Sequence, residues 1–120
     1  MRKKPGDRWL TSELGCPDCA GVLRVNGSGK RHPIYECYVG HRFTTASLLQ
    51  AKEAQLESAL WSTQVLLAHV EMVCHTILRD KRQAARMQRP VRQRMREAQA
   101  QQQTIRDIIE STHVCELTDL

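Results

Sequence analysis

The stretch CPDCAGVLRVNGSGKRHPIYECYVGH, residues 16–41, holds three of the five cysteines of the chain and ends in a histidine. A Cys-x-x-Cys pair opens it and a Cys-x-x-x-His pair closes it. Each short gap lets one tight turn direct two side chains at one metal ion, and three sulfurs with one nitrogen complete a tetrahedral zinc site. A full set leaves no position for water, so we expect one structural Zn²⁺. The predicted ligands are Cys16, Cys19, Cys37 and His41.

The residues between the two ligand pairs predict a β-hairpin. Two runs rich in β-branched and aromatic residues flank NGSGKRHP, whose Asn-Gly and Ser-Gly steps suit a tight reversal. We predict Val22–Val25 paired with Ile34–Tyr38, and a solvated His32 in the connecting loop. Two short strands are marginal in water, whereas zinc binding supplies folding free energy on the order of 10 kcal/mol. The metal should therefore hold this segment folded.

Composition divides the chain near residue 44. All six glycines and three of the four prolines lie in residues 1–43. Residues 44–120 contain no glycine and one proline, Pro90. Aromatic residues make up only 4% of the chain, which favours an elongated helical second half over a large globular core. We expect an α protein with a small β part: an N-terminal zinc ribbon followed by a long antiparallel helical hairpin.

Two apolar seams define the predicted helices. The first seam lies on a helix that begins at Thr44 or Thr45, either of which could be its N-cap. This seam is widened by Leu48, Leu66, Val73 and Leu78. The first seam consists of Leu49, Leu56, Leu60, Thr63, Leu67, Val70, Cys74 and Ile77. The second consists of Val91, Met95, Ala98, Gln102, Ile105, Ile109 and Thr112.

Proline decides where we place the turn between the helices. Because Pro90 lacks an amide hydrogen and disfavours helix at Arg89, the turn is predicted at 88–90. The alternative is a turn at 79–82, where Asp80 and Gln83 have capping-box spacing.

The predicted segments follow from that turn. They are an N-terminal arm (1–14), the ribbon (15–43), a long helix (44–88), a second helix (91–112) and a tail (113–120). The shorter helix leaves the early part of the first seam (Leu49, Leu56, Leu60 and Trp61) uncovered. We expect the ribbon to cover it, or a second copy of the chain in a dimeric bundle.

The motifs in CPDCAGVL and YECYVGHRFTTASLLQAKEAQLESALW resemble the C-terminal tail of chemotaxis protein-glutamate methylesterases and their relatives. The likeness is best over residues 15–61. It implies a zinc ribbon feeding long helices, with the four ligands above and Gly40 as a knuckle glycine. Ala20 departs from it, since the tails have glycine after the second ligand. The receiver and esterase domains of those enzymes have no counterpart here, so the resemblance implies a free-standing accessory module, with no esterase activity.

Charge offers a second candidate surface. The net charge is +5, which favours acidic partners, and residues 79–96 hold eight basic residues and one acidic residue. This basic segment is either a solvated helix tip or a contact surface for an acidic partner such as nucleic acid. Its basic residues are Arg79, Lys81, Arg82, Arg86, Arg89, Arg92, Arg94 and Arg96.

Three function classes remain. We predict a non-catalytic zinc-binding interaction module, chemosensory-like by resemblance, with a protein partner or a homodimer. Alternatives are a zinc-containing nucleic-acid-binding protein, in which Arg24, Lys30, Arg31 and Arg42 could add phosphate contacts, and a metal storage or transfer protein. Storage would need a second metal site; the candidates are Cys74, His75, His113 and Cys115.

Location is predicted from the cysteines and from two absences. The start MRKKPGDRWL has no apolar stretch behind its basic residues, so we expect no signal peptide, and no apolar run is long enough for a membrane span. Clustered free thiols suit a reducing cytoplasm. No catalytic nucleophile or carboxylate pair is identifiable, so we expect no enzyme.

Overall fold

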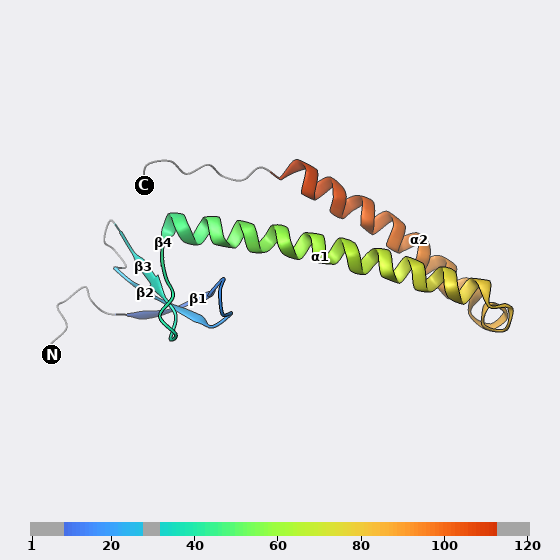
Figure 1. The fold of residues 1–120 in the computed structure, drawn as a ribbon, viewed down its shortest axis with the longest axis horizontal. Helices are drawn as coiled ribbons and strands as arrows, with labels where there is room; N and C mark the ends of the chain where they lie inside the picture. Colours follow the sequence, from blue (N-terminus) through green and yellow to red (C-terminus); the bar gives the residue numbers. More distant parts are fainter. Residues whose placement is uncertain (1–8, 28–31, 113–120) are drawn as a thin grey trace. The chain divides into compact units, whose positions relative to one another are not determined.

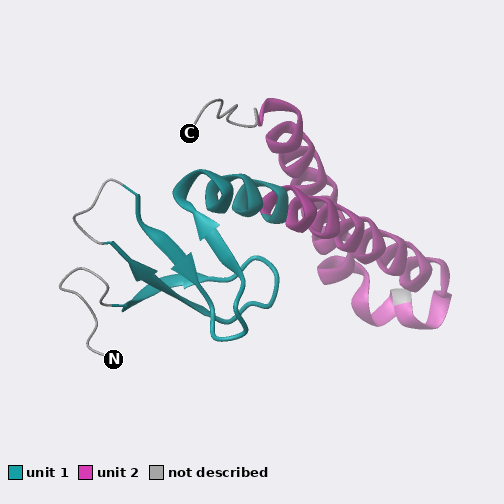
Figure 2. Ribbon diagram, turned by 60° about the vertical axis from the view of Figure 1, so that its left-hand side comes forward, with its two compact units in different colours: residues 1–55, 114–120 teal, residues 56–113 magenta. Residues whose placement is uncertain are grey.

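The structure, a computed structural model, describes residues 9–27 and 32–112. A four-stranded sheet precedes two long helices (Figure 1), in agreement with the predicted α protein with a small β part. The chain divides into two compact units, with the boundary between Gln55 and Leu56 (Figure 2). The predicted tail at 113–120 lies outside the described residues.

The sheet is an antiparallel meander in which each strand pairs with the next along the chain. Its strands are β1 (Leu10–Gly15), β2 (Val22–Asn26), β3 (Ile34–Glu36) and β4 (Arg42–Thr44). The predicted hairpin is β2 with β3, where Arg24 lies opposite Glu36 and Val25 opposite Tyr35. The pairing is confirmed, although β3 ends at Glu36 because Cys37 begins a turn.

Two strands were not predicted. Residues 10–14, expected in an arm, form most of β1, which pairs with β2 through Leu10–Val25 and Thr11–Arg24. The Ser12 hydroxyl donates to the Leu23 carbonyl at 2.6 Å, so a polar side chain helps fix this strand. β4 completes the other edge of the sheet, where Glu36 lies opposite Arg42.

The long helix α1 (Thr45–Arg79) starts directly after β4. Thr44 is its N-cap, as predicted: Thr44 Oγ1 accepts from the Ser47 amide at 3.1 Å, and Ser47 Oγ accepts from the Thr44 amide at 2.9 Å. Reciprocal bonds of this kind satisfy amides that lack helical partners. The helix therefore begins at a fixed residue beside the sheet.

Leu48 joins α1 to the core of the first unit. It is buried together with Cys16, Leu23 and Cys37, and Tyr35 and Phe43 pack against this cluster. The prediction that the ribbon covers Leu49 is wrong, since that side chain is 40% exposed. Neighbouring helix positions point about 100° apart, and the sheet contacts the side of α1 on which Leu48 lies.

The prediction that the first helix ends at a turn over residues 88–90 is also wrong. α1 ends at Arg79, α2 spans Lys81–Ser111, and Pro90 lies inside α2. Asp80 separates the helices as the N-cap of α2, and its carboxylate accepts from the Arg82 amide at 3.0 Å. The predicted helices 44–88 and 91–112 are corrected accordingly. The Asp80 cap stabilises the start of α2, and Pro90 lies only nine residues beyond Lys81, the first residue of this helix.

The helices of the second unit meet through polar as well as apolar contacts. Glu71 of α1 accepts hydrogen bonds from Gln99 Nε2 (2.9 Å) and Gln102 Nε2 (2.7 Å) of α2. Glu71 lies nine residues before Asp80, whereas Gln99 lies nineteen after it. Roughly the first ten residues of α2 therefore take part in the reversal, and the remainder runs antiparallel to α1 (Figure 1).

The predicted seams supply what little this unit buries. Cys74 of α1 and Ala98 of α2 are the buried apolar residues among its described positions, and neighbouring seam residues such as Leu67 and Ile105 are partly buried. Leu56, predicted in the first seam, is 54% exposed. Within the described residues, no helix combines the length and the apolar character that a membrane span requires.

The Glu71 cluster makes a prediction about pH. Hydrogen bonds from Gln99 and then Gln102 lower the pKa of Glu71, and His75, with Nε2 at 3.7 Å, lowers it further against the opposing effect of burial. A depressed folded pKa adds stability that is present above the unfolded value and lost as the pH falls through the folded value. Thermal melts should therefore show less loss of stability below about pH 4.3 in Glu71→Gln than in wild type.

Glu110→Gln is the matched control, because Glu110 is an exposed carboxylate of α2. Its acid melts should follow those of wild type. Equal slopes in all three proteins would contradict the role given to Glu71.

Candidate metal centre

The first ligand pair lies in the turn between β1 and β2. The Ala20 amide donates to the Cys16 carbonyl at 2.8 Å, and the Cys16 amide donates to the Gly21 carbonyl at 2.6 Å. These bonds fold residues 16–21 back on themselves, so that both thiols lie on one side. A Cβ on Gly21 would approach Cys19 Sγ to 3.4 Å, so glycine leaves room beside this thiol.

The second ligand pair repeats this arrangement between β3 and β4. The Gly40 amide donates to the Cys37 carbonyl at 3.1 Å, and the Cys37 amide donates to the His41 carbonyl at 3.1 Å. The His41 amide also approaches Cys37 Sγ to 3.4 Å. Gly40 has φ +104°, a conformation that side chains rarely adopt, in agreement with its predicted role as the knuckle glycine.

The two turns bring all four predicted ligands together. Their ligand atoms lie within 4.8 Å of one another, and His41 Nδ1 is 3.3 Å from Cys37 Sγ and 3.6 Å from Cys16 Sγ. In a tetrahedral zinc site, bonds of about 2.3 Å to sulfur and 2.0–2.1 Å to nitrogen put these atoms roughly 3.6 Å apart. The two Sγ–Nδ1 distances are therefore close to those that a bound zinc ion would impose, and all four ligand atoms are near enough for one ion to hold them.

Burial differs among the ligands. Cys16 and Cys37 are fully buried in the core of the first unit, His41 is partly buried, and Cys19 is exposed. Cys16, Cys19, Cys37 and Cys74 are all free thiols. One side of the site thus belongs to the core, while Cys19 closes it from the solvent side.

The thiols interact strongly with one another. Burial raises the pKa of Cys37, but hydrogen bonds from the backbone amides of His41 and Val39 outweigh it, and the pKa is lowered to about 6. At Cys19 the Gly21 amide lowers the pKa, but burial and the thiols of Cys16 and Cys37 raise it in sum. A bound cation resolves this conflict, because it stabilises every thiolate at once.

The four residues therefore fit a divalent, thiophilic ion. Three sulfurs and one imidazole at tetrahedral spacing are typical of structural zinc. A metal ion held by all four side chains in a tetrahedral site would have no position left for water or substrate.

The other metal candidates are not assembled. Among the described residues, the four ligands above form the only group of three or more potential ligands. Cys74 is buried in the helical unit, and His75 pairs with Glu71. His32, predicted to be solvated, is exposed, while His113 and Cys115 lie outside the described residues.

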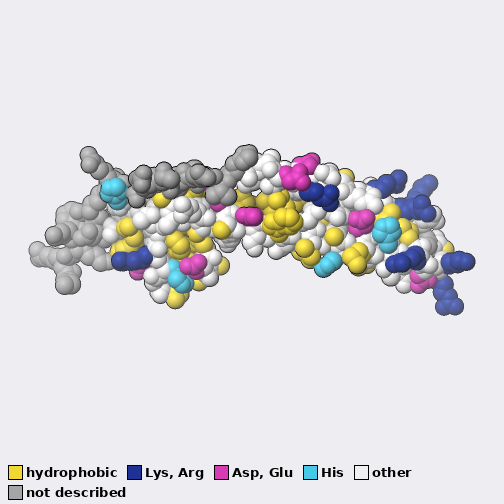
Figure 3. All heavy atoms as spheres, turned by 45° about the horizontal axis from the view of Figure 1, so that its top comes forward, with side chains coloured by type: hydrophobic (Ala, Val, Ile, Leu, Met, Phe, Trp, Pro, Cys, Tyr) yellow, Lys and Arg dark blue, Asp and Glu magenta, His cyan; other side chains and the backbone are white. Residues whose placement is uncertain are grey.

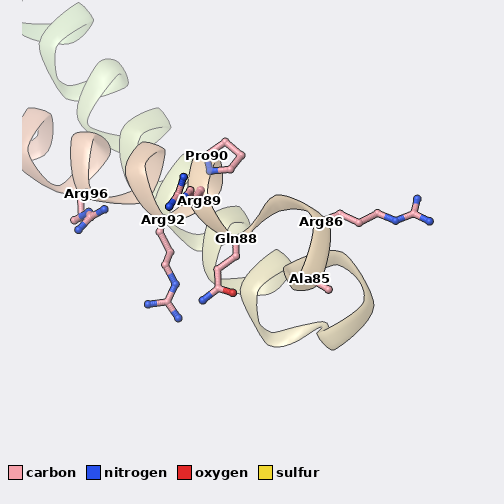
Figure 4. A pocket seen from close by; sticks show the side chains of 7 residues that line it. All are labelled: Ala85, Arg86, Gln88, Arg89, Pro90, Arg92 and Arg96. Atoms are coloured by element: carbon pink, nitrogen blue, oxygen red, sulfur yellow. The ribbon is translucent and has the colours of Figure 1, made fainter.

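The predicted basic residues gather where α1 gives way to α2, at one end of the helical unit (Figure 3). There an open pocket of about 490 Å³ is lined by residues of α2, none of them acidic (Figure 4). With its amide turned over, Gln88 accepts hydrogen bonds through its oxygen from Arg92 Nε and Nη2, both at 3.2 Å. The Arg86 side chain extends away from the rest. Arg94 does not line the pocket; it pairs with Glu97 and donates a hydrogen bond to Gln101. The lining residues are Ala85, Arg86, Gln88, Arg89, Pro90, Arg92 and Arg96.

Two arginines of the sheet serve the fold. Arg24 lies between the rings of Trp9 and Tyr38, 5.0 and 5.2 Å from their centroids, and pairs with Glu36 at 3.6 Å. Arg42 binds the same carboxylate at 2.7 Å. The sequence suggested both arginines as phosphate contacts; Lys30 and Arg31, suggested with them, lie outside the described residues. To bind phosphate, Arg24 and Arg42 would have to give up these partners. Both arginines lie opposite Glu36, Arg24 on β2 and Arg42 on β4. Only this strand pairing could have indicated the ion pairs from the sequence.

Comparison with known proteins adds no relative: no family model, curated protein or solved structure matches the chain. The resemblance to methylesterase tails stays a prediction.

Ala20 gives a sharp test of the first turn. Its φ of +63° is left-handed, which costs a non-glycine residue about 1–2 kcal/mol. Ala20→Gly should therefore stabilise the zinc-bound first unit by about 1 kcal/mol, measured by denaturant unfolding. Ala51→Gly in α1 is the matched control and should destabilise by about 0.5–1 kcal/mol. A loss of stability in both variants would contradict the strained turn.

Proposed function

We propose that this chain is a non-catalytic, zinc-stabilised protein-interaction module. The observation that carries the proposal is the Cys₃His cluster, whose four ligand atoms lie within 4.8 Å of one another. Zinc binding here is folding free energy, since strands of three to six residues gain little from pairing alone.

A structural role is favoured over catalysis because protein side chains fill the coordination shell. Catalytic zinc keeps one position for water or substrate. A role in metal storage is disfavoured, because it would require further sites or weaker ligands.

The interaction role is supported by α1. Capping by Thr44 and burial of Leu48 fix the start of this helix at the metal-bound core, and large apolar side chains along its length stay exposed. A contiguous exposed apolar surface indicates a partner. We propose a reducing, cytoplasmic setting, which clustered free thiols favour, and a chemosensory-like signalling role, which rests on the resemblance alone.

The metal requirement is tested by Cys37→Ser. This change removes a buried ligand, and the purified variant should lose its zinc and the folded sheet, since about 10 kcal/mol of binding free energy would be lost. Zinc content by elemental analysis and amide exchange across residues 10–44 measure both effects.

Cys74→Ser is the matched control, because Cys74 is a buried thiol outside the cluster; it should keep one zinc per chain. A wild-type protein that is metal-free and still protects its sheet from exchange would overturn the proposal. Several rapidly exchanging zinc ions per chain would instead favour metal transfer.

A second candidate function is binding to nucleic acid through the basic segment. The observation that favours it is the arginine-lined pocket, which contains no acidic side chain. Arg89 and Arg96 carry no ion pair within the described part of the chain. Against it, the segment offers no aromatic side chains for stacking on bases.

Salt titration separates this candidate from the first. If phosphates bind the pocket, Arg89→Glu with Arg92→Glu should lower the slope of log K against log salt by about 2 for duplex DNA. Arg106→Glu, an arginine of α2 outside the segment, should change it little. No DNA or RNA binding by the wild-type chain at physiological salt would exclude this function.

A further inference from the structure

We infer that a second copy of this chain docks antiparallel on one face of α1 and forms a dimeric helical bundle. The face, called here the dimer face, consists of Trp61, Val65, Ala68 and Met72. The inference rests on the proposed interaction function and names its partner.

The helical unit lacks an interior of its own. Cys74 and Ala98 are the only buried apolar residues among its described positions. A unit of about 60 residues is marginal even when it buries some 60% of its surface. Much of the apolar surface of α1 is still in water, so a further packing layer is expected.

The dimer face has coiled-coil spacing. Its residues follow one another at steps of four, three and four, and the same rhythm continues outward to Ser58 and His75. Trp61, Val65 and Met72 are 52%, 50% and 63% exposed. The seam that meets α2 includes Leu60, Leu67 and Cys74, and at 3.6 residues per turn the two seams point roughly 140° apart. A helix with two apolar seams belongs inside a bundle of more than two helices.

A third side of α1 is less suited to docking. It carries Leu66 and Val73, which are also exposed. However, Ser62, His69 and Thr76 occupy the alternate positions of that seam. The dimer face has four consecutive apolar positions, so it can be desolvated without burying an unpaired polar side chain.

The dimer face is complementary to itself when reversed. In an antiparallel pair centred between residues 66 and 67, Trp61 lies opposite Met72 of the second copy, and Val65 lies opposite Ala68. Each layer pairs a larger with a smaller or more flexible side chain, and thioether contacts with aromatic rings are favourable. An open hollow of about 320 Å³ lined by Met72, His75, Thr76 and Arg79 would face residues 54–61 of the second copy and would receive its Trp61.

Charge selects the antiparallel direction and a partner with this same sequence. Glu57 and Arg79 flank opposite ends of the dimer face, and neither has an ion-pair partner among the residues described. The antiparallel register places Glu57 of each copy within one helical turn of Arg79 of the other. A parallel pair would place the two basic segments, each with eight basic residues, beside each other at a large electrostatic cost.

The experiment measures the mass of the zinc-loaded full chain by sedimentation equilibrium over a range of concentrations at physiological salt. The wild type should be a dimer at micromolar concentration. Val65→Glu should weaken dimerisation by about a hundredfold or more, because a carboxylate would be buried without a partner.

Val73→Glu is the matched control, since Val73 is the same residue type on the same helix and is 58% exposed. Dimerisation of this variant should be unchanged. A monomeric wild type, or a dimer broken by Val73→Glu and not by Val65→Glu, overturns the inference.

Direction is tested by exchanging charges. Glu57→Lys and Arg79→Glu should each weaken the dimer by about tenfold, and the double variant should recover most of the loss. Additive losses in the double variant overturn the antiparallel register.

Zinc content, read on the same samples, keeps the two proposals apart. A monomer with one zinc per chain removes this inference and leaves the proposed function, whereas a metal-free dimer does the reverse.

Discussion

Three thiols and an imidazole brought within 4.8 Å of one another are the interaction on which the sheet depends. Two of these residues, Cys16 and Cys37, are buried in the core of the described sheet together with Leu23 and Leu48. They are therefore core residues as well as candidate metal ligands. Without a cation, nothing would join the four ligands to one another, and strands of three to six residues gain little stability from pairing alone.

The same core determines where the long helix starts. Leu48 lies one turn into α1, and the cap at Thr44 directly follows β4. Metal, sheet and the first turn of the helix are thus linked by local contacts within one unit. With a metal bound in this core, an exposed apolar helix that begins there would lose less conformational entropy on binding a partner than a free amphipathic peptide would.

The sequence predicted best those features whose determinants are close together. Cys16 with Cys19, and Cys37 with His41, reveal the site because each pair lies on one turn. The β2–β3 hairpin follows from the glycine-containing loop between its strands. β1 escaped prediction because it is an edge strand held partly by the Ser12 hydroxyl, and its polar residues resemble a linker. The helix break required a choice between two competing signals, Asp80 and Pro90, and pattern alone does not show that a capped break prevails over a proline that a helix can accommodate.

The two units differ in the source of their stability. The first can gain it internally, from an ion that needs no partner protein. Among its described residues, the second buries Cys74 and Ala98 and little else apolar, and its Glu71 cluster is polar, which is the reason for proposing that a second copy supplies further apolar surface. The many glutamines of α2 are consistent with this difference. Their amide groups can donate hydrogen bonds to the Glu71 carboxylate, while the apolar side chains of α2 pack on another side of the helix. Since α1 is continuous from the core that holds the ligand cluster to the proposed dimer face, metal binding and the proposed association would act on one helix at different points along its length.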